Sequence, residues 1–317
     1  MTHDHRLSLE RIARASGVID AAFRDSPQFE APSLSEDLGC RLVVKVETLN
    51  PIRSFKARGA LFLMSELSGR PHLVCATAGN FGQGMAYAAR KHGFPLTVFT
   101  HSDANPLKIA RMRAMGADVR AAGTGPDEPH DEAVAFATET GAVLVVDGRD
   151  AAIAEGAGTI GMELLRWPEP FDAIVVPLGD GALLGGVARW VKAHVPATRT
   201  VGVCAAGSPA MERSWRRGQV VAVLPKTIAD GISIQTPFEE AVTDLRGIVD
   251  DILLVKDETM ITAMRLAHQE LGLVLEPSGA AGLAAILAHG EQFRGKLVGT
   301  VLTGGNPTAG QVRQWLA

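Results

Sequence analysis

The sequence predicts an α/β protein built on parallel sheets. Short apolar runs typical of buried strands alternate with longer segments of helical periodicity along most of the chain, and no repeat, low-complexity tract or long linker interrupts them. Consecutive parallel strands need a crossover connection, which is usually a helix, so this order predicts right-handed crossovers and sheets covered on both faces. The pattern alone does not place a domain boundary.

The alternation can be followed in order along the chain. Residues 8–23 have apolar side chains at helical spacing and predict a packing helix, while Asn105 followed by Pro106 predicts a helix start, and Gly116 its end. The predicted strands cover residues 42–46, 72–77, 96–100, 118–122, 142–146, 173–178, 200–205, 248–255 and 297–302. The further predicted helices cover residues 80–91, 106–115, 129–140, 156–166, 183–193, 211–217, 258–271 and 278–289, with a short one at the C-terminal end.

The composition is that of an ordinary globular protein. Its 317 residues suffice for a sizeable core and, as a soft prior, about two domains, with 46% apolar and 21% charged residues. A net charge of −4 gives no electrostatic case for nucleic acid or an anionic membrane, and the longest apolar stretch, residues 280–288, is far too short for a membrane span. Three scattered cysteines and the lack of an apolar leader favour a reducing, cytoplasmic location.

Lys56 stands at the start of a predicted helix that follows a predicted strand. Ser54 is the predicted N-cap, because a serine oxygen can accept a bond from an unpaired N–H at a helix start. The positive end of the helix dipole and semi-buried surroundings both favour a neutral amine, so we expect a lowered pKa for Lys56. Schiff-base chemistry requires such a lysine, but this stretch taken alone favours an ordinary lysine with only its stem buried.

The stretch Ser54-Phe55-Lys56-Ala57-Arg58-Gly59-Ala60 resembles the cofactor-lysine motif of the threonine/serine dehydratase family, which are pyridoxal-phosphate (PLP) enzymes of fold type II, the tryptophan synthase β-like group. Other family landmarks follow in the expected order over nearly the whole chain. The resemblance implies two doubly wound open-sheet domains with PLP in the cleft between them. The larger comprises residues 1–68 and 148–317, and the smaller, mobile one residues 69–147. It also implies that Lys56 is the catalytic residue and binds PLP as a Schiff base, with Phe55 as a further cofactor contact.

A turn of small residues between a predicted strand and helix is the first supporting motif. Such a turn presents backbone N–H groups where a carboxylate can bind, although a plain structural turn has the same composition. By the resemblance, this loop holds the substrate carboxylate, and Asn80 hydrogen-bonds the phenolic oxygen of PLP. The expected substrate contacts are Ser54, Thr77, Ala78, Gly79, Asn80 and Phe81, the last replacing a frequent family histidine. Related racemases place a catalytic serine where this chain has Ala78, so we expect no racemase activity.

A glycine-containing turn at residues 179–183 is the second motif. Its glycines permit a nest of backbone N–H donors that can hold a phosphate. The dinucleotide-binding fingerprint G-x-G-x-x-G does not match here, because Leu184 occupies the position of its third glycine. By the resemblance, the PLP phosphate is bound here. The expected contacts are Gly179, Asp180, Gly181, Ala182 and Leu183. The family usually has four consecutive glycines, and the carboxylate of Asp180 beside a phosphate dianion is repulsive, so we expect it to weaken PLP binding.

Thr303 ends the last predicted strand and begins the sequence Thr-Gly-Gly-Asn. By the resemblance, its hydroxyl lies against the pyridine nitrogen of PLP, where a neutral group does not enforce a pyridinium and so favours β-elimination over transamination. Residues 227–232 resemble a loop bordering the active site, and residues 276–280 a turn near the cofactor ring. Glu276 in that turn is either a neighbour of the cofactor or a buried, hydrogen-bonded structural carboxylate.

Several departures from the family concern metal and substrate. Many relatives bind a divalent cation in the loop after the strand at 200–205, but residues 205–211 contain no carboxylate here, and hard cations need oxygen ligands. We therefore expect no metal at that position. Residues 147–150 replace a usual polar loop, Ile234 stands where relatives often have a polar residue, and Arg53 replaces a usual glycine. These changes predict a pocket reshaped for a side chain other than threonine's, without indicating its new preference.

The sequence therefore predicts a PLP-dependent dehydratase that converts a 3-hydroxy amino acid such as L-threonine or L-serine to a 2-oxo acid and ammonia. We expect it to act as a cytoplasmic homodimer on a small molecule, with neither nucleic acid nor membrane as a partner. Two alternatives share the fold and cofactor: a dehydratase of a bulkier 3-hydroxy amino acid, and a β-replacement enzyme of cysteine-synthase type. A nucleotide-dependent oxidoreductase, disfavoured by the missing glycine, and a non-catalytic binder of PLP or an amino acid are alternatives from other classes.

Overall fold

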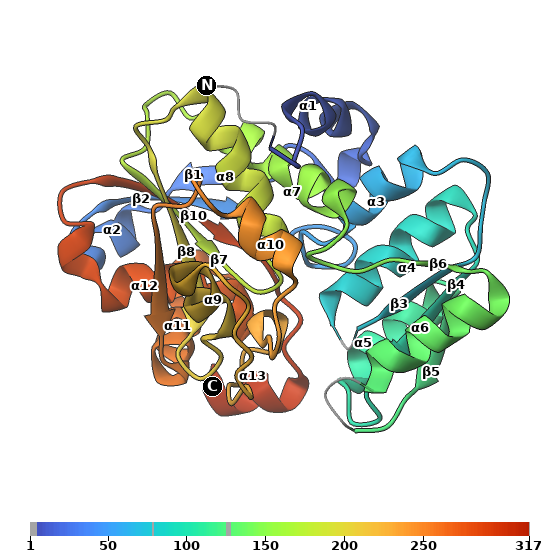
Figure 1. The fold of residues 1–317 in the computed structure, drawn as a ribbon. Helices are drawn as coiled ribbons and strands as arrows, with labels where there is room; N and C mark the ends of the chain where they lie inside the picture. The colour runs from blue at the N-terminus through green and yellow to red at the C-terminus, as the bar shows by residue number, and fades with distance from the viewer. Residues whose placement is uncertain (1–4, 78, 125–127, 317) are drawn as a thin grey trace.

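The computed structural model describes residues 5–77, 79–124 and 128–316, and its strands form two open sheets (Figure 1). The larger sheet has the strand order β1-β2-β10-β7-β8-β9 and the smaller one β5-β4-β3-β6. Neighbouring strands are parallel except β1 and β2, which are antiparallel. The strands are β1 (Gln28–Glu30), β2 (Arg41–Val46), β3 (Leu73–Ala76), β4 (Leu96–Thr100), β5 (Asp118–Ala121), β6 (Val143–Leu144), β7 (Ala173–Pro177), β8 (Arg199–Ala205), β9 (Asp251–Val255) and β10 (Leu297–Leu302).

Helices cover both faces of the larger sheet because its central strands are apolar on both sides. In β7, Val175 belongs to the core shared with α12, whereas Ile174 and Val176 belong to the core shared with α7 and α8. This alternation follows from the two-residue period of a strand. The helices of this part of the chain are α1 (Leu9–Val18), α2 (Pro32–Leu38), α7 (Ala151–Leu164), α8 (Ala182–His194), α9 (Ala210–Arg217), α10 (Glu239–Asp244), α11 (Asp257–Leu271), α12 (Pro277–Ala288) and α13 (Ala309–Trp315).

The smaller sheet is also covered on both faces. Cys75 and Val98 pack in the core that includes Met85 of α4, while Val74 and Phe99 pack with Ala133 of α6 on the opposite face. The helices between the two sheets and around the smaller one are α3 (Ala57–Glu66), α4 (Asn80–His92), α5 (Pro106–Ala114) and α6 (Glu128–Thr140). Figure 1 shows this sheet and its helices beside the larger body, next to α3.

Most predicted elements are present with shifted ends. The prediction at Asn105 is confirmed, because its side chain accepts from the N–H of Leu107 and Pro106 begins α5. The helix predicted over residues 8–23 was too long: α1 ends at Val18, and a separate 3₁₀ turn follows, capped by Asp20. The strand predicted at 248–255 begins only at Asp251. Elements β1, α2 and α10 were not predicted, since segments of three to seven residues are too short for periodicity to reveal.

A buried ion cluster anchors the beginning of α3. Arg58 is fully buried, and its guanidinium pairs with Glu47, which directly follows β2, at 2.8 Å and with Glu163 of α7 at 2.7 Å. Lys45 of β2 also pairs with Glu163. Buried charges persist when they are paired and hydrogen-bonded, so the first turn of α3 is tied to both the end of β2 and α7.

The two sheets correspond to two separate runs of the chain. The chain leaves the larger sheet after β2, forms the smaller sheet with β3 to β6, and returns to the larger sheet with β7. The predicted α/β organisation in two domains is confirmed, whereas the boundaries at residues 68/69 and 147/148 and the mobility of the smaller domain stay predictions. Within the described residues, each helix is too short or too polar to cross a bilayer.

Candidate active site

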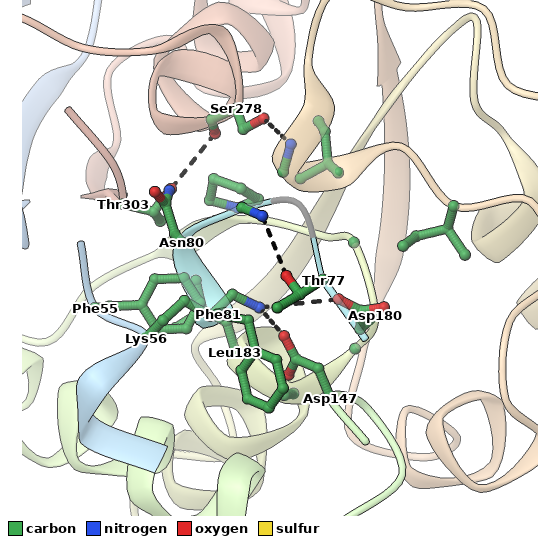
Figure 2. Close-up of a pocket in the computed structure, with 18 of the residues that line it drawn as sticks. Phe55, Lys56, Thr77, Asn80, Phe81, Asp147, Asp180, Leu183, Ser278 and Thr303 are labelled. Carbon is green, nitrogen blue, oxygen red and sulfur yellow. Dashed lines mark hydrogen bonds and ion pairs between the residues drawn. The ribbon is translucent and has the colours of Figure 1, made fainter. Parts of the chain in front are cut away.

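A cavity of about 250 Å³ lies where strand ends from both sheets meet. It is lined by residues within three positions of the ends of β3, β6, β7 and β10, among them Thr77, Asp147, Gly179 and Thr303. The carboxyl ends of parallel strands are the usual ligand-binding edge of open α/β sheets. Figure 2 shows the Lys56 amine inside this cavity, with Asp147 and Asp180 to one side of it and Ser278 and Thr303 to the other.

The turn before α3 positions Lys56. The Asn50 side chain accepts from the N–H groups of Ile52 and Ser54, each at 3.2 Å, and Ser54 forms an isolated antiparallel bridge with Gly304. The prediction that Ser54 caps the helix was wrong, since α3 begins at Ala57 and Lys56 itself is the N-cap residue. The hydroxyl of Ser54 accepts from the Lys56 N–H at 3.4 Å, so it stabilises the turn that precedes α3.

The Lys56 amine is paired with two carboxylates. It forms an ion pair with Asp147 and lies 3.8 Å from the carboxylate of Asp180. Burial alone lowers the pKa of Lys56, but the negative charges of Asp147 and Asp180 outweigh it, so the pKa is raised above its ordinary value. The predicted lowering of this pKa was therefore wrong, because nearby charge dominates over burial and over the helix dipole.

The two carboxylates beside Lys56 are themselves incompletely compensated. Burial and then the charge of Asp147 raise the pKa of Asp180 to about 7, although Lys56 opposes this rise. In Asp147, the Oδ1 oxygen is buried without a hydrogen-bond partner among the described residues. Such an orphaned buried acceptor indicates a site whose polar groups are completed by a ligand or by a change of protonation.

The turn at residues 179–183 forms a cradle suited to a phosphate. All of Gly179, Asp180, Gly181, Ala182 and Leu183 line the cavity. Gly181 caps α8 with a φ of 100°, so no side chain occupies the helix start, and a Cβ added to Gly179 lies 2.9 Å from the carbonyl oxygen of Gly231. An open helix N-terminus attracts an anion, so the residues fit a phosphate-bearing cofactor, with Asp180 as the one opposing group.

The loop between β3 and α4 forms another wall of the cavity. Thr77 accepts from the Gly79 N–H at 3.1 Å, and Thr77, Gly79, Asn80 and Phe81 all line the cavity. Ala78 lies outside the described residues. Asn80 donates to Glu276 and accepts from Asn306 at 2.9 Å, so its amide joins the two domains across the cavity. Its predicted bond to a cofactor oxygen stays a prediction.

The remaining predicted site residues fall into two groups. Phe55, Leu183 and Thr303 line the cavity; the Phe55 ring centroid lies 5.1 Å from the Lys56 amine, and the Thr303 hydroxyl donates to the Ser278 carbonyl at 3.5 Å. Ser54 is fully buried behind Lys56 and is not among the described residues that line the cavity. Its role as a substrate contact stays a prediction.

A second lysine lies outside the cavity lining and pairs with two carboxylates that belong to the lining. Lys108 of α5 is 1% exposed, and its amine lies 2.8 Å from Asp230 and 3.4 Å from Glu276, both in the larger domain. Burial raises the pKa of Glu276, partly offset by Lys108. Glu276 is a buried, hydrogen-bonded carboxylate that also lines the cavity, and its position beside the cofactor stays a prediction.

Sequence reasoning placed residues 147–150 near the pocket but missed the pairing of Asp147 with Lys56, and it missed Lys108 as a partner of Asp230 and Glu276. For Asp147, a signal existed, because it is a charged residue directly after a predicted parallel strand, where ligand-binding residues concentrate. For Lys108, the local sequence carries no signal, because its partners Asp230 and Glu276 are more than a hundred residues away.

Comparisons with known proteins agree with this geometry. The family model described as "Pyridoxal-phosphate dependent enzyme" matches residues 19–304. The L-threonine ammonia-lyase of Thermotoga maritima is 33% identical over 95% of this chain and 76% of its own length. The L-threo-3-hydroxyaspartate ammonia-lyase of a Pseudomonas species is 32% identical over 94% of this chain and 95% of its own. The crystal structure of a T.th. threonine deaminase superimposes with a TM-score of 0.90 at 35% identity, covering 95% of this chain and 99% of that one.

The fold and the cavity therefore define an enzyme of the fold type II class, with its site between two α/β domains. The chain belongs to the pyridoxal-phosphate dependent enzyme family, and its cofactor is PLP. The predicted family, fold type and cofactor are confirmed by these comparisons.

Proposed function

We propose that this protein is a PLP-dependent ammonia-lyase that converts a 3-hydroxy amino acid, such as L-threonine or L-serine, to a 2-oxo acid and ammonia. The observation that carries the proposal is the Lys56 amine, which lies inside the cavity between the open N-terminus of α8 and the hydroxyl of Thr303. Relatives named L-threonine ammonia-lyase and a solved threonine deaminase support the same reaction class.

The proposed roles follow from the positions of the side chains. Bound PLP supplies an electron sink for the α-carbon of an amino acid. Lys56 would hold the cofactor through Nζ, and the free Lys56 amine would accept the α-proton of the substrate. Asp147 is paired with that amine and orients it. The N–H groups of residues 179–183 bind the phosphate, and Phe55, Asn80 and Thr303 complete the cofactor contacts.

The proposed substrate contacts lie on the opposite wall. Thr77, Gly79, Asn80 and Phe81 surround the start of α4, whose first N–H groups favour a carboxylate. Ser54, whose hydroxyl accepts from the Lys56 N–H, is proposed as a further substrate contact. A neutral hydroxyl at Thr303 favours loss of the β-hydroxyl over transamination. Because the position of the racemase serine is Ala78, we propose elimination without racemisation.

An absorbance titration tests this proposal. Purified protein with PLP is mixed with L-threonine, L-serine and bulkier 3-hydroxy amino acids in turn, while visible absorbance and 2-oxo acid are recorded. We expect the absorbance to change and 2-oxo acid to appear. A change without 2-oxo acid that is followed by rapid product with an added thiol supports the β-replacement alternative, and no turnover under either condition indicates a binder.

Replacing the lysine provides the matched control. In Lys56→Ala, we expect turnover to fall to background, because the base and the cofactor attachment are lost together. The circular dichroism spectrum should match that of the wild-type protein, since Lys56 contributes little to the apolar core. Retained activity in this variant contradicts the assignment of Lys56.

We further propose that the protein acts in the cytoplasm as a homodimer, on a small molecule rather than on nucleic acid or a membrane, and without a metal in the loop after β8. Three buried, unpaired cysteines (Cys40, Cys75 and Cys204) support a reducing compartment. Gel filtration with light scattering tests the dimer, and activity unchanged by a chelator tests the absence of a metal. We also propose that the domain boundaries lie at residues 68/69 and 147/148 and that the smaller domain moves.

A further inference from the structure

The cavity is strongly unbalanced in charge. Among the described residues that line it, Lys56 is the only cation, while four carboxylates line it: Asp147, Asp180, Asp230 and Glu276. Figure 2 shows Asp147 and Asp180 both directed at the Lys56 amine. Lys56 is thus already engaged, and the phosphate of the cofactor adds further negative charge to the same space.

The other basic side chains near the cavity are also engaged or directed elsewhere. Lys108 pairs with both Asp230 and Glu276, so its single positive charge offsets only one of these two carboxylates. Arg111 donates to Asn306, and Arg53 is exposed. His130 packs behind Phe238, with ring centroids 6.3 Å apart. None of these four side chains is among the described residues that line the cavity.

The cavity also has a continuous apolar lining. Phe81, Val145 and Val146 contribute from the smaller domain, and Ile232, Ile234 and Phe238 from one segment of the larger domain. Ile232 is buried, and Ile234 and Phe238 are half-buried, so the latter two present apolar surface toward the open space. Such surface gains from contact with an apolar group and offers no partner for a charged one.

The backbone of the segment around Ile234 is held in place before any ligand binds. The Ile234 N–H donates to the Ser208 hydroxyl at 2.9 Å, and the Ser208 hydroxyl donates to the Ile234 carbonyl at 3.1 Å. Upstream, the Gly231 N–H donates to Ser278 at 2.9 Å. A wall fixed by such bonds can select among ligands by size and polarity, since it does not rearrange freely to suit each one.

We propose that the side chain of the substrate is uncharged and apolar, so that the enzyme takes 3-hydroxy monocarboxylic amino acids of threonine's size or larger and excludes those with a second carboxylate, such as 3-hydroxyaspartate. This inference rests on the proposed function and specifies its substrate class. The relatives include both an L-threonine and an L-threo-3-hydroxyaspartate ammonia-lyase, so the charge of the cavity distinguishes between two activities that identity alone does not separate.

Ammonia release tests the proposal, because every candidate substrate yields the same product. Steady-state rates are measured with L-serine, L-threonine, 3-hydroxynorvaline and L-threo-3-hydroxyaspartate. We expect kcat/KM for 3-hydroxyaspartate to be on the order of 100-fold below that for L-threonine, because its second carboxylate meets like charges without a free cation. We expect 3-hydroxynorvaline to match or exceed L-serine. A kcat/KM for 3-hydroxyaspartate equal to or above that for L-threonine overturns the proposal.

Two variants of one wall residue sharpen the test. Ile234→Arg places a cation in the lining, and we expect the ratio of kcat/KM for 3-hydroxyaspartate to that for L-threonine to rise about tenfold. Ile234→Met changes shape without charge, and its ratio should stay within about threefold of the wild-type ratio. If both variants change the ratio equally, charge is not the selecting property. If Ile234→Arg does not fold, the ratio of kcat/KM for 3-hydroxyaspartate to that for L-threonine in the wild-type protein tests the proposal by itself.

A binding measurement separates failure of this inference from failure of the proposed function. L-norvaline and L-aspartate lack a β-hydroxyl, so neither can lose water, but each can perturb the visible absorbance of the bound cofactor. We expect half-saturation by L-norvaline at a concentration on the order of 100-fold lower than by L-aspartate. If no 3-hydroxy amino acid releases ammonia, the proposed function fails while this preference still stands. A preference for L-aspartate contradicts the inference whatever the activity.

Discussion

Arg58 and Lys56 are two residues apart at the start of α3, and each is surrounded by carboxylates, but the two ion clusters differ in balance. Arg58 is fully buried and, together with Lys45, faces Glu47 and Glu163, so two cations meet two carboxylates. The side chain of Lys56 is 13% exposed, and this single cation pairs with both Asp147 and Asp180, so one cation meets two carboxylates. One carboxylate oxygen in this second cluster, Asp147 Oδ1, has no hydrogen-bond partner among the described residues.

The difference separates a structural cluster from a functional one. A buried cluster whose charges cancel and whose hydrogen bonds are complete needs no ligand, and it fixes the position of the helix that carries it. A cluster with an excess carboxylate and a shifted pKa remains ready to accept a proton or a ligand, which is characteristic of active sites. The rigid Arg58 cluster therefore supports the unbalanced Lys56 cluster from two residues away.

Breaking the balanced cluster should have the largest effect on stability. In Arg58→Ala, we expect the free energy of unfolding to fall by about 3–5 kcal/mol, because Glu47 and Glu163 remain buried with Lys45 as the one cation left in the cluster. Urea denaturation of the protein without cofactor measures this. Arg41→Ala is the matched control, since Arg41 also pairs with two glutamates, Glu30 and Glu169, but at the surface. An equally small loss in both variants contradicts the assigned role of the Arg58 cluster.

Removing the excess carboxylate should tighten cofactor binding. In Asp180→Gly, we expect the Kd of PLP to fall about tenfold, because a negative charge next to the phosphate cradle disappears. Asp180→Asn removes the charge without adding the backbone freedom of glycine, so the two variants should agree. Fluorescence titration of the protein without cofactor measures both affinities. Unchanged or weaker binding in Asp180→Asn shows that the carboxylate does not repel the phosphate.

The same carboxylate should make stability depend on pH. The pKa of Asp180 is raised from an ordinary value of 3.8 to about 7, so the folded protein retains a proton that the unfolded chain has already lost in this interval. The free energy of unfolding of the protein without cofactor should therefore decrease as the pH rises from about 4 to about 7, and this contribution should level off above that. Asp180→Asn should lose this component of the slope. Denaturation midpoints at several pH values, compared between the two proteins, provide the measurement.

Neutralising Asp147 should have the smallest effect of these changes, because we expect it to alter only the pKa of the Lys56 amine. Burial lowers the pKa of Lys56, and the charge of Asp147 contributes most to raising it, so Asp147→Asn should lower this pKa while burial persists. The pH dependence of Lys56 modification by an amine-specific reagent, followed by peptide mass spectrometry, reports the change. The surface lysine Lys91, paired with Asp20, serves as an internal reference. A modification profile of Lys56 that does not move to lower pH is the contrary result.

Local patterns were sufficient for many features of the site. The alternation of strands and helices predicted the α/β class, and short motifs that resemble the family singled out Lys56, Asn80, Gly179 and Thr303, which the structure brings to one cavity. These features depend on neighbours along the chain, such as the period of a strand or the turn between a strand and a helix. The direction of the Lys56 pKa shift was predicted wrongly, because it depends on Asp147 and Asp180, which are remote in sequence.

By itself, the sequence determined the fold class and the order of the elements, because both are encoded in short-range periodicity, and a contiguous motif that resembles the family predicted Lys56 as the cofactor lysine. Only the tertiary structure decided the charge balance of the two clusters, the burial of Lys108 against Asp230 and Glu276, and the apolar wall around Ile234. Electrostatic energy depends on distances in space and on burial, and residues far apart in the sequence acquire both only when the chain folds.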